Sequence, residues 1–352
     1  ILGVGAANAY LNHQPISSGI NIQKAIDVML SLIVSPTVGL LVAGGLMLLA
    51  KRIWADSKIH KNPEDRQMVD GKKRPPFWTR VTLIVSAMGV SFVHGSNDGQ
   101  KGIGMIMLVL IGVVPGAFVV NLDSSAYQIA RTRDAAIHMR SFYEQHAEDL
   151  SQLMTLGKDA NHTLPQIFKC DTQATLAAIE TLDQRLNNVD SYRQLNVDER
   201  RQVRRLLLCI DDTAKKVSKM PSISSKEQDD LNKLRKDLTA TTEYAPTWVI
   251  VAVALALGVG TMIGWKRIVL TVGEKIGQKG MTYAQGMMAQ ITAAVSIGVA
   301  SMTGMPVSTT HVLSSAVAGT MLATRSGLQS GTVKNILLAW VLTLPATFLL
   351  AA

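Results

Sequence analysis

A string of polar residues and glycines interrupts a long apolar stretch at residues 94–102, and it limits what this chain can fold into. The string reads HGSNDGQKG, and residues 81–93 and 103–120 on its two sides are almost wholly apolar. An Asp or Lys at the centre of a bilayer costs about 2.5–3.5 kcal/mol on insertion scales. Membrane proteins keep such groups where they line a polar cavity and contact an ion or a substrate.

The same string carries glycines at positions 95, 99 and 102, which favour local unwinding of a helix. Unwound backbone is tolerated in a membrane only where protein or water satisfies the freed amides. We therefore expect residues 81–120 to form a broken transmembrane segment. Its candidates for contacting a substrate or coupling ion are Asn97, Asp98 and Lys101, with Gln100 as a secondary candidate.

The charges of the chain are confined to particular stretches. Of the 26 acidic residues, 19 lie between Asp123 and Glu243, in a chain that is 47% hydrophobic. This segregation indicates membrane segments around a polar insert, and so an all-α polytopic membrane protein. The net charge of +9 comes from Lys and Arg in short loops. That pattern sets membrane orientation, and it does not indicate nucleic-acid binding.

The alternation of apolar and polar stretches predicts five regions. We expect 1–50 to be the tail of a first membrane repeat, 51–80 a basic cytoplasmic loop, and 121–245 a polar domain of helices inserted after the broken segment 81–120. Residues 246–352 then hold the remaining transmembrane and re-entrant segments. Because both ends of the chain lie in apolar runs, we also expect it to be an N-terminally truncated piece of a longer protein.

The side of the polar domain depends on how often segment 81–120 crosses the membrane. Basic residues place the loops 51–80 and 266–280 in the cytoplasm. A single crossing of 81–120 then makes the domain 121–245 periplasmic, whereas two crossings make it cytoplasmic and put the 266–280 cluster outside, against the bias. We favour the periplasmic alternative.

The only two cysteines of the chain, Cys170 and Cys209, both fall in this polar domain. In an oxidising periplasm two cysteines in one small domain favour a disulfide. The alternative is a pair of unpaired buried thiols.

A second motif, GMPVSTTH at 304–311, places three hydroxyl residues beside a histidine after a helix-breaking Gly and Pro. Hydroxyls and free amides at a helix N-terminus suit a tetrahedral oxyanion. The alternatives are a kink whose Ser and Thr side chains bond their own backbone, and a core histidine. The apolar arm after it, 312–324, is too short to cross, so a re-entrant hairpin with 281–303 is expected. The candidates are Ser308, Thr309 and Thr310, with His311 secondary.

Neither motif predicts an enzyme. Gln100 separates Gly99 from Lys101, so the first string lacks the Gly-Lys-Ser/Thr of a nucleotide-binding loop. No Gly-x-Ser-x-Gly elbow accompanies the Ser and His of the second, which argues against hydrolysis. Nothing in either pattern calls for a cofactor or a resident metal.

Two segments of the chain resemble one another, Lys24–Pro36 and Lys334–Pro345. Each has a Lys, an apolar helix and a Pro some eleven or twelve residues later. Chance similarity between apolar segments is common, but secondary transporters are often built from such repeats, with the substrate site near the midplane where they meet.

GSNDGQKGIG followed far downstream by GMPVSTTH resembles the inorganic phosphate transporter (Pit) family, and the similarity extends over the whole chain. It implies an inverted-repeat secondary transporter with broken or re-entrant helices in the bacterial inner membrane. It also implies symport of inorganic phosphate with protons in the lipid bilayer, often as a divalent-metal phosphate complex. A homo-oligomer is a further expectation. Asn97 and Asp98 match the family's Asn-Asp pair, and Ser308–Thr310 its phosphate-contacting turn.

The chain departs from the family pattern at two positions. Lys101 stands where many members have Asn, and Gln290 where many have Glu on the helix before the turn, so a sodium site is in doubt. We therefore hypothesise that Lys101 supplies the cation and Asp98 carries the coupling proton. The alternative is that a Lys101–Asp98 salt bridge only holds the broken helix together.

Two other functions are open at this point. The chain could be a membrane-anchored periplasmic helical module, a sensor or assembly protein, or it could be an inactive part of the transporter. Mere anchors need no intramembrane Asn-Asp-Lys cluster, so transport is the favoured interpretation.

Overall fold

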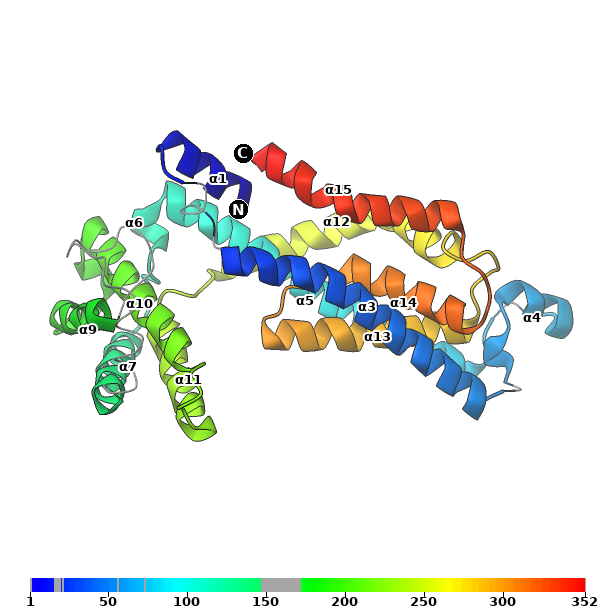
Figure 1. The fold of residues 1–352 in the computed structure, drawn as a ribbon, viewed down its shortest axis with the longest axis horizontal. Helices are drawn as coiled ribbons and strands as arrows, with labels where there is room; N and C mark the ends of the chain where they lie inside the picture. Colours follow the sequence, from blue (N-terminus) through cyan, green and yellow to red (C-terminus); the bar gives the residue numbers. More distant parts are fainter. Residues whose placement is uncertain are drawn as a thin grey trace. The chain divides into compact units, whose positions relative to one another are not determined.

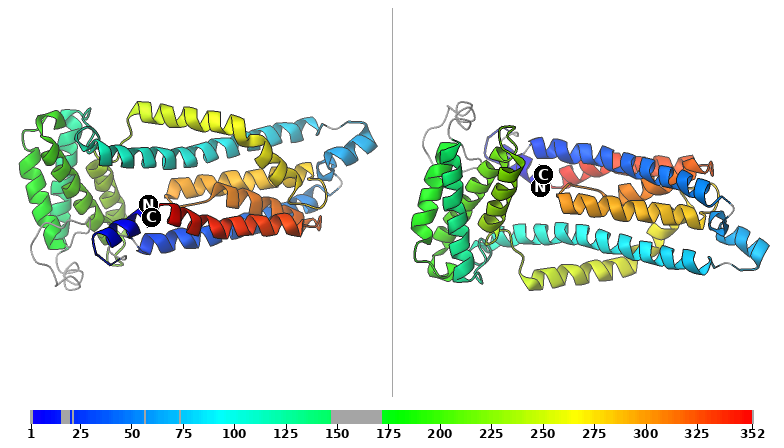
Figure 2. Two further views of the ribbon diagram at one scale, coloured as in Figure 1. Left: turned by 90° about the horizontal axis from the view of Figure 1, so that it is seen from above. Right: turned by 90° about the horizontal axis from the view of Figure 1, so that it is seen from below.

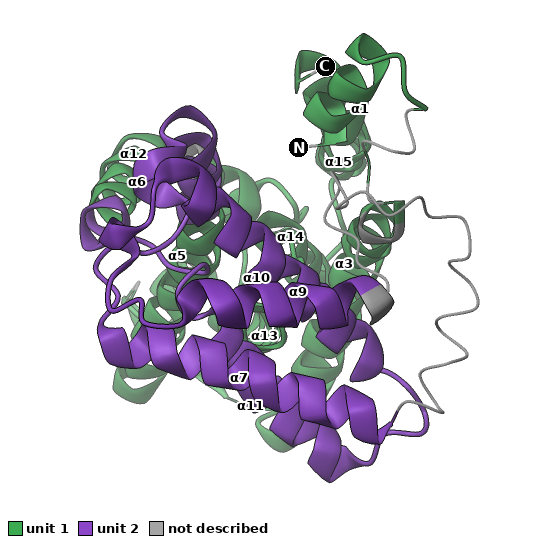
Figure 3. Ribbon diagram, turned by 90° about the vertical axis from the view of Figure 1, so that its left-hand side faces the viewer, with its two compact units in different colours: residues 1–101, 252–352 green, residues 102–251 purple. Residues whose placement is uncertain are grey.

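The computed structural model describes residues 2–15, 20, 22–55, 57–72, 74–146 and 172–351, and its described elements are almost all helices (Figure 1). The chain divides into two compact units, which Figure 3 colours separately. Unit 1 comprises residues 1–101 and 252–352, and unit 2 comprises residues 102–251.

Most of the apolar helices belong to unit 1. Five of them are long and apolar enough to cross a membrane in the part of the chain that the structure describes, as the sequence predicts. These are Ala25–Ile53 within α3, Phe77–Val113 (α5), Thr247–Lys266 within α12, Tyr283–Thr303 (α13) and Ser330–Ala351 (α15). The elements of this part are α1 (Leu2–Leu11), α3 (Ile22–Ile53), η1 (Lys58–His60), α4 (Pro63–Asp70), α5 (Phe77–Val113), α12 (Thr247–Glu274), α13 (Tyr283–Thr303), α14 (Thr309–Ala323) and α15 (Ser330–Ala351).

Helices α3 and α14 form the closest contact in unit 1, and glycines make it possible. A Cβ atom on Gly319 would overlap the carbonyl oxygen of Leu40, and one on Gly39 would lie 2.8 Å from the carbonyl oxygen of Val312. Small residues let two helix backbones approach in a membrane, where packing has to replace the hydrophobic effect. Ala43 on α3 and Ala316 on α14 are fully buried beside this contact.

The packing of four helices is reciprocal. Helix α14 packs on α3, and α1 packs on α15. Figures 1 and 2 show α1 next to the C-terminal end of α15. Helix α1 precedes α3 in the chain as α14 precedes α15, so each short helix lies against the long helix that follows the other. This exchange supports the similarity between Lys24–Pro36 and Lys334–Pro345.

The predicted break at residues 94–102 is wrong, because α5 runs as one helix through the whole string. The interruption comes instead at Val114, with φ −127° and ψ 61°, immediately before Pro115. A proline disfavours helical backbone at the preceding residue, whereas a glycine inside a helix costs only about 1 kcal/mol. Proline therefore ends this helix, and the glycines of the polar string do not.

The second predicted break is confirmed. Helix α13 ends at Gly304, whose φ of 68° is left-handed backbone that favours glycine, and α14 begins after Ser308. The two helices pack as a hairpin, with Ala293 and Ile297 of α13 against Val312 of α14. Helix α14 has only 15 residues, which is too short to cross a bilayer. That α14 is re-entrant stays a prediction that rests on this length.

Three connections of unit 1 lie at the same end of its helices (Figures 1 and 2). They are the segment that contains α4, the loop between α12 and α13, and the loop between α14 and α15. The first belongs to the predicted basic loop 51–80, and the second contains only the end of the predicted loop 266–280, because α12 continues to Glu274. Their common position agrees with one cytoplasmic face for unit 1.

Unit 2 contains the helical insert predicted from the sequence, with a core of its own. Val203, Leu207 and Ile210 of one helix are fully buried and pack with Leu182 and Leu238 of two others. The unit extends beyond the predicted limits 121–245 because it includes the end of α5 and the start of α12. Its other elements are α6 (Pro115–Phe118), α7 (Ala126–Gln145), α9 (Thr172–Leu186), η2 (Tyr192–Gln194), α10 (Val197–Val217) and α11 (Ser225–Thr239).

The predicted disulfide involves a residue outside the described part of the chain. Cys209 lies on α10 with 8% of its surface exposed, and Cys170 falls in the range 147–171 that the structure does not describe. We expect the folded protein to show no reactive thiol without reductant and two after reduction in denaturant. Titration with a thiol reagent measures this, and two reactive thiols in the folded, unreduced protein would contradict the bond.

Candidate functional site

One face of α5 contacts α13 and α14 along a row of residues spaced three or four apart. Ser86 and Asn97 of this row are buried, and Val90 and Val93 between them pack against α13. Lys101 continues the row by one turn. Side chains at such spacing share one face of a helix. Because the polar string is helical, only the side chains on that face turn toward α14.

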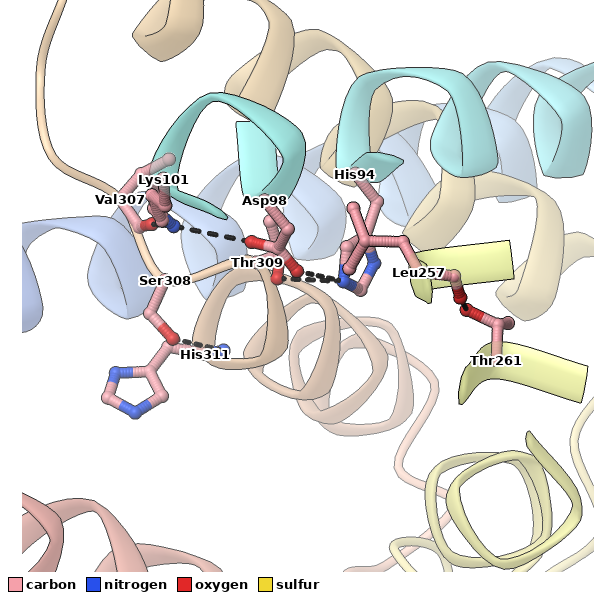
Figure 4. A network of polar contacts seen from close by, with 9 residues as sticks. All are labelled: His94, Asp98, Lys101, Leu257, Thr261, Val307, Ser308, Thr309 and His311. Carbon is pink, nitrogen blue, oxygen red and sulfur yellow. Dashed lines mark hydrogen bonds and ion pairs between the residues drawn. The ribbon is translucent and has the colours of Figure 1, made fainter. Parts of the chain in front are cut away.

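Asp98 is the centre of a polar cluster on this face (Figure 4). Its Oδ2 lies 2.9 Å from Nε2 of His94, one turn earlier, and its Oδ1 lies 3.4 Å from Nζ of Lys101. Lys101 also donates from Nζ to the carbonyl oxygen of Val307, at 3.2 Å. Nε2 of His94 is 3.3 Å from Oγ1 of Thr309. The two motifs, far apart in the sequence, are therefore joined in the structure.

The N-terminus of α14 lies at the cluster. Ser308 caps the helix, and its hydroxyl accepts a hydrogen bond from the amide of His311 at 3.4 Å. The first amides of a helix lack intrahelical partners and carry the positive end of its dipole, which favours an anion. Thr309, at 6% exposure, presents its hydroxyl at this end.

Asn97 lies beside the cluster with an unsatisfied amide. It is 6% exposed, and its Nδ2 has no hydrogen-bond partner in the part of the chain that the structure describes. A buried donor without a partner costs about 1–3 kcal/mol, so this group favours a ligand that can accept from it. The side chains of His94, Asp98 and Lys101 keep 44%, 34% and 51% of their surface exposed, so the cluster is open on one side.

Comparison with known proteins identifies the family. A sequence profile described as "Phosphate transporter family" matches residues 1–351. The chain belongs to the phosphate transporter family. The low-affinity inorganic phosphate transporters PitA and PitB of Escherichia coli K12 are 54% and 52% identical to it, over 100% of the chain and 72% of each relative. A low-affinity inorganic phosphate transporter of Buchnera aphidicola from Acyrthosiphon pisum is 46% identical over the same shares. No solved structure matches the chain.

Membership of the phosphate transporter family establishes the setting of the cluster. The chain is a multi-pass protein of the bacterial inner membrane, and its five candidate spans agree with this. The polar cluster therefore lies among helices that cross the lipid bilayer, where unpaired charge is costly and marks a functional site.

The structure separates the predicted site residues of this phosphate transporter into two groups. Asp98 pairs with Lys101, and Thr309 joins them through His94, with Asn97 next in sequence and Ser308 capping α14. The other group lies apart from the cluster. Gln100 and Thr310 are exposed, Gln290 accepts a hydrogen bond from Ser86 at 2.6 Å, and His311 stacks on Trp340.

His94 is the cluster residue that the sequence analysis did not name as a candidate. Its spacing of four residues before Asp98 was the available signal, because a helix places such residues one above the other. The spacing of His94 and Asp98 has this meaning only in a continuous helix. Because a break was expected at residues 94–102, His94 was not predicted as a site residue.

Proposed function

We propose that the chain carries inorganic phosphate across the inner membrane, as the names of its relatives state for them. The observation that supports this most is the cluster of Lys101, His94 and Thr309 around Asp98, facing the N-terminus of α14. Nitrogen donors, a hydroxyl and free helix amides together suit a tetrahedral oxyanion.

We infer that Asp98 carries the coupling proton. A carboxylate beside an incoming phosphate repels it, and protonation removes that repulsion. Lys101 and His94 both contact the carboxyl group, so a proton on Asp98 would release their N–H groups to the phosphate. Proton and phosphate would then bind together and leave together.

Uptake into proteoliposomes tests this function. We expect the purified chain to accumulate radiolabelled phosphate when an inward proton gradient is imposed, and to accumulate little with a sodium gradient or with labelled sulfate. Parallel reactions with Mg²⁺ and with EDTA test the metal–phosphate complex that the family resemblance implies. Absence of phosphate uptake from correctly folded protein would favour the alternatives of a membrane-anchored module or an inactive part of a transporter.

Lys101 provides a test of the coupling ion. We expect Lys101→Asn to make phosphate uptake depend on sodium, because it removes the fixed cation and restores the Asn common in the family. Uptake by the variant is measured with sodium and with choline, and Lys236→Asn in unit 2 is the matched control. Wild-type uptake by Lys101→Asn without sodium would contradict the assignment and leave Lys101 as a structural partner of Asp98.

We also propose that unit 2 lies in the periplasm. Helix α5 has 37 residues, which is roughly 55 Å, and runs without a break, so it supports one crossing and not two. A cysteine placed at the exposed position Asp190 is expected to react with an impermeant maleimide in intact spheroplasts, whereas one at Lys72 in the basic loop is not. The reverse pattern would place unit 2 in the cytoplasm.

That the protein forms homo-oligomers stays a prediction, which light scattering of the purified protein can test.

A further inference from the structure

His311 belongs to the phosphate-contacting motif, yet its side chain turns away from the cluster. Figure 4 shows its ring on the side of α14 opposite Asp98. The imidazole stacks on the indole of Trp340 in α15, with ring centroids 4.1 Å apart and planes at 30°. Its Nδ1 is buried without a hydrogen-bond partner in the described ranges, so the stack is a major contact of the ring.

A proline inside α3 lies next to a second contact of the same imidazole. Pro36 lies inside α3 and has no N–H, so the carbonyl of Leu32 lacks its usual partner four residues on. The imidazole of His311 lies close to the backbone of Leu32. The first turn of α14 is thus attached to α3 and to α15 through one side chain.

Helix geometry connects this attachment to the site. Successive residues of an α-helix are 100° apart, so residues 309 and 311 point to nearly opposite sides of α14. Holding His311 against Trp340 therefore turns Thr309 toward His94. A rotation of α14 by one residue would replace buried Thr309 with Thr310, which is exposed in this structure.

We propose that His311 is a positioning residue, and that its stack on Trp340 sets the rotation of α14 so that Thr309, and not Thr310, faces Asp98. The proposal rests on the proposed function only in taking this turn as the place where phosphate binds. The residue touches no substrate in this role, and it acts through the helix that carries Thr309.

Cysteine labelling tests the rotation without any transport measurement. In the full chain, Thr309→Cys is expected to react slowly with a maleimide and Thr310→Cys quickly, as read from the modified peptides by mass spectrometry. Adding Trp340→Leu is expected to bring the two rates together, whereas Trp340→Phe, which keeps an aromatic partner, preserves the difference. Phe92→Leu, which removes an exposed aromatic side chain from α5, is the control and should preserve it too.

Phosphate uptake by the same Trp340 variants and by His311→Leu gives an independent result. We expect His311→Leu and Trp340→Leu to raise KM about three- to tenfold, the size of one lost aromatic contact, with the maximal rate nearly unchanged. Trp340→Phe is expected to restore the wild-type KM. Unchanged labelling rates in Trp340→Leu would overturn the positioning role, even if uptake were lost. The labelling rates at positions 309 and 310 could instead behave as expected in a chain that transports no phosphate. That result would support the positioning role of His311 and reject the proposed function.

Discussion

Replacing Asp98 with Asn is expected to abolish accumulation of phosphate driven by a proton gradient. An amide keeps the shape of the side chain but cannot carry a proton, and it loses the charge that holds Lys101 and His94. We expect uptake to fall by at least about 30-fold, which corresponds to about 2 kcal/mol. Initial rates in proteoliposomes measure it.

The matched control is Asp190→Asn, which removes a carboxylate from an exposed position of unit 2. It is expected to transport like the wild type. Size-exclusion profiles show whether each variant is folded. Gradient-driven uptake by Asp98→Asn within twofold of the wild type would contradict the assignment of the coupling proton to Asp98.

Replacing Gly319 with Ala is expected to destabilise unit 1 most among changes that add a single methyl group. The new Cβ would overlap the carbonyl oxygen of Leu40, and backbone atoms cannot move aside as a flexible side chain can. Overpacking of this kind typically costs about 1–3 kcal/mol. We expect a lower midpoint of thermal unfolding in detergent and less protein in the membrane.

Gly45→Ala provides the comparison, because it lies on α3 and a Cβ there would meet nothing within 4 Å. It should unfold at the wild-type temperature or slightly above, since Ala is the better helix former. An equal fall in the midpoint of thermal unfolding in the two variants would mean that the α3–α14 contact does not decide the stability of unit 1.

The apolar helices and the hairpin at 304–308 could be predicted from the sequence because their signals are local. Lengths of apolar runs give the spans, and Gly304 with Pro306 gives the turn. The behaviour of the polar string was misjudged for a physical reason. Three glycines weaken a helix, but neighbouring residues that favour it can offset that, whereas Pro115 removes an amide outright.

The site could be predicted only in part. The residue types showed that Asp98 and Lys101 need partners, and the second motif supplied hydroxyls. Which hydroxyl meets the cluster depends on the rotation of α14, and in our proposal that rotation is set by a side chain of another helix, Trp340. No local pattern carries this information, so Thr309 could not be distinguished from Thr310 beforehand.

The contact between α3 and α14 also has a consequence for biogenesis. Gly39 and Gly319 are far apart in the sequence, so α3 leaves the ribosome long before α14 exists. During that interval the glycine face of α3 lacks its partner, and α14, with 15 residues, is too short to hold a transmembrane position alone. The contact between α3 and α14 can therefore form only after α14 has been made. Chains released before α14 would display an unpartnered glycine face to membrane proteases.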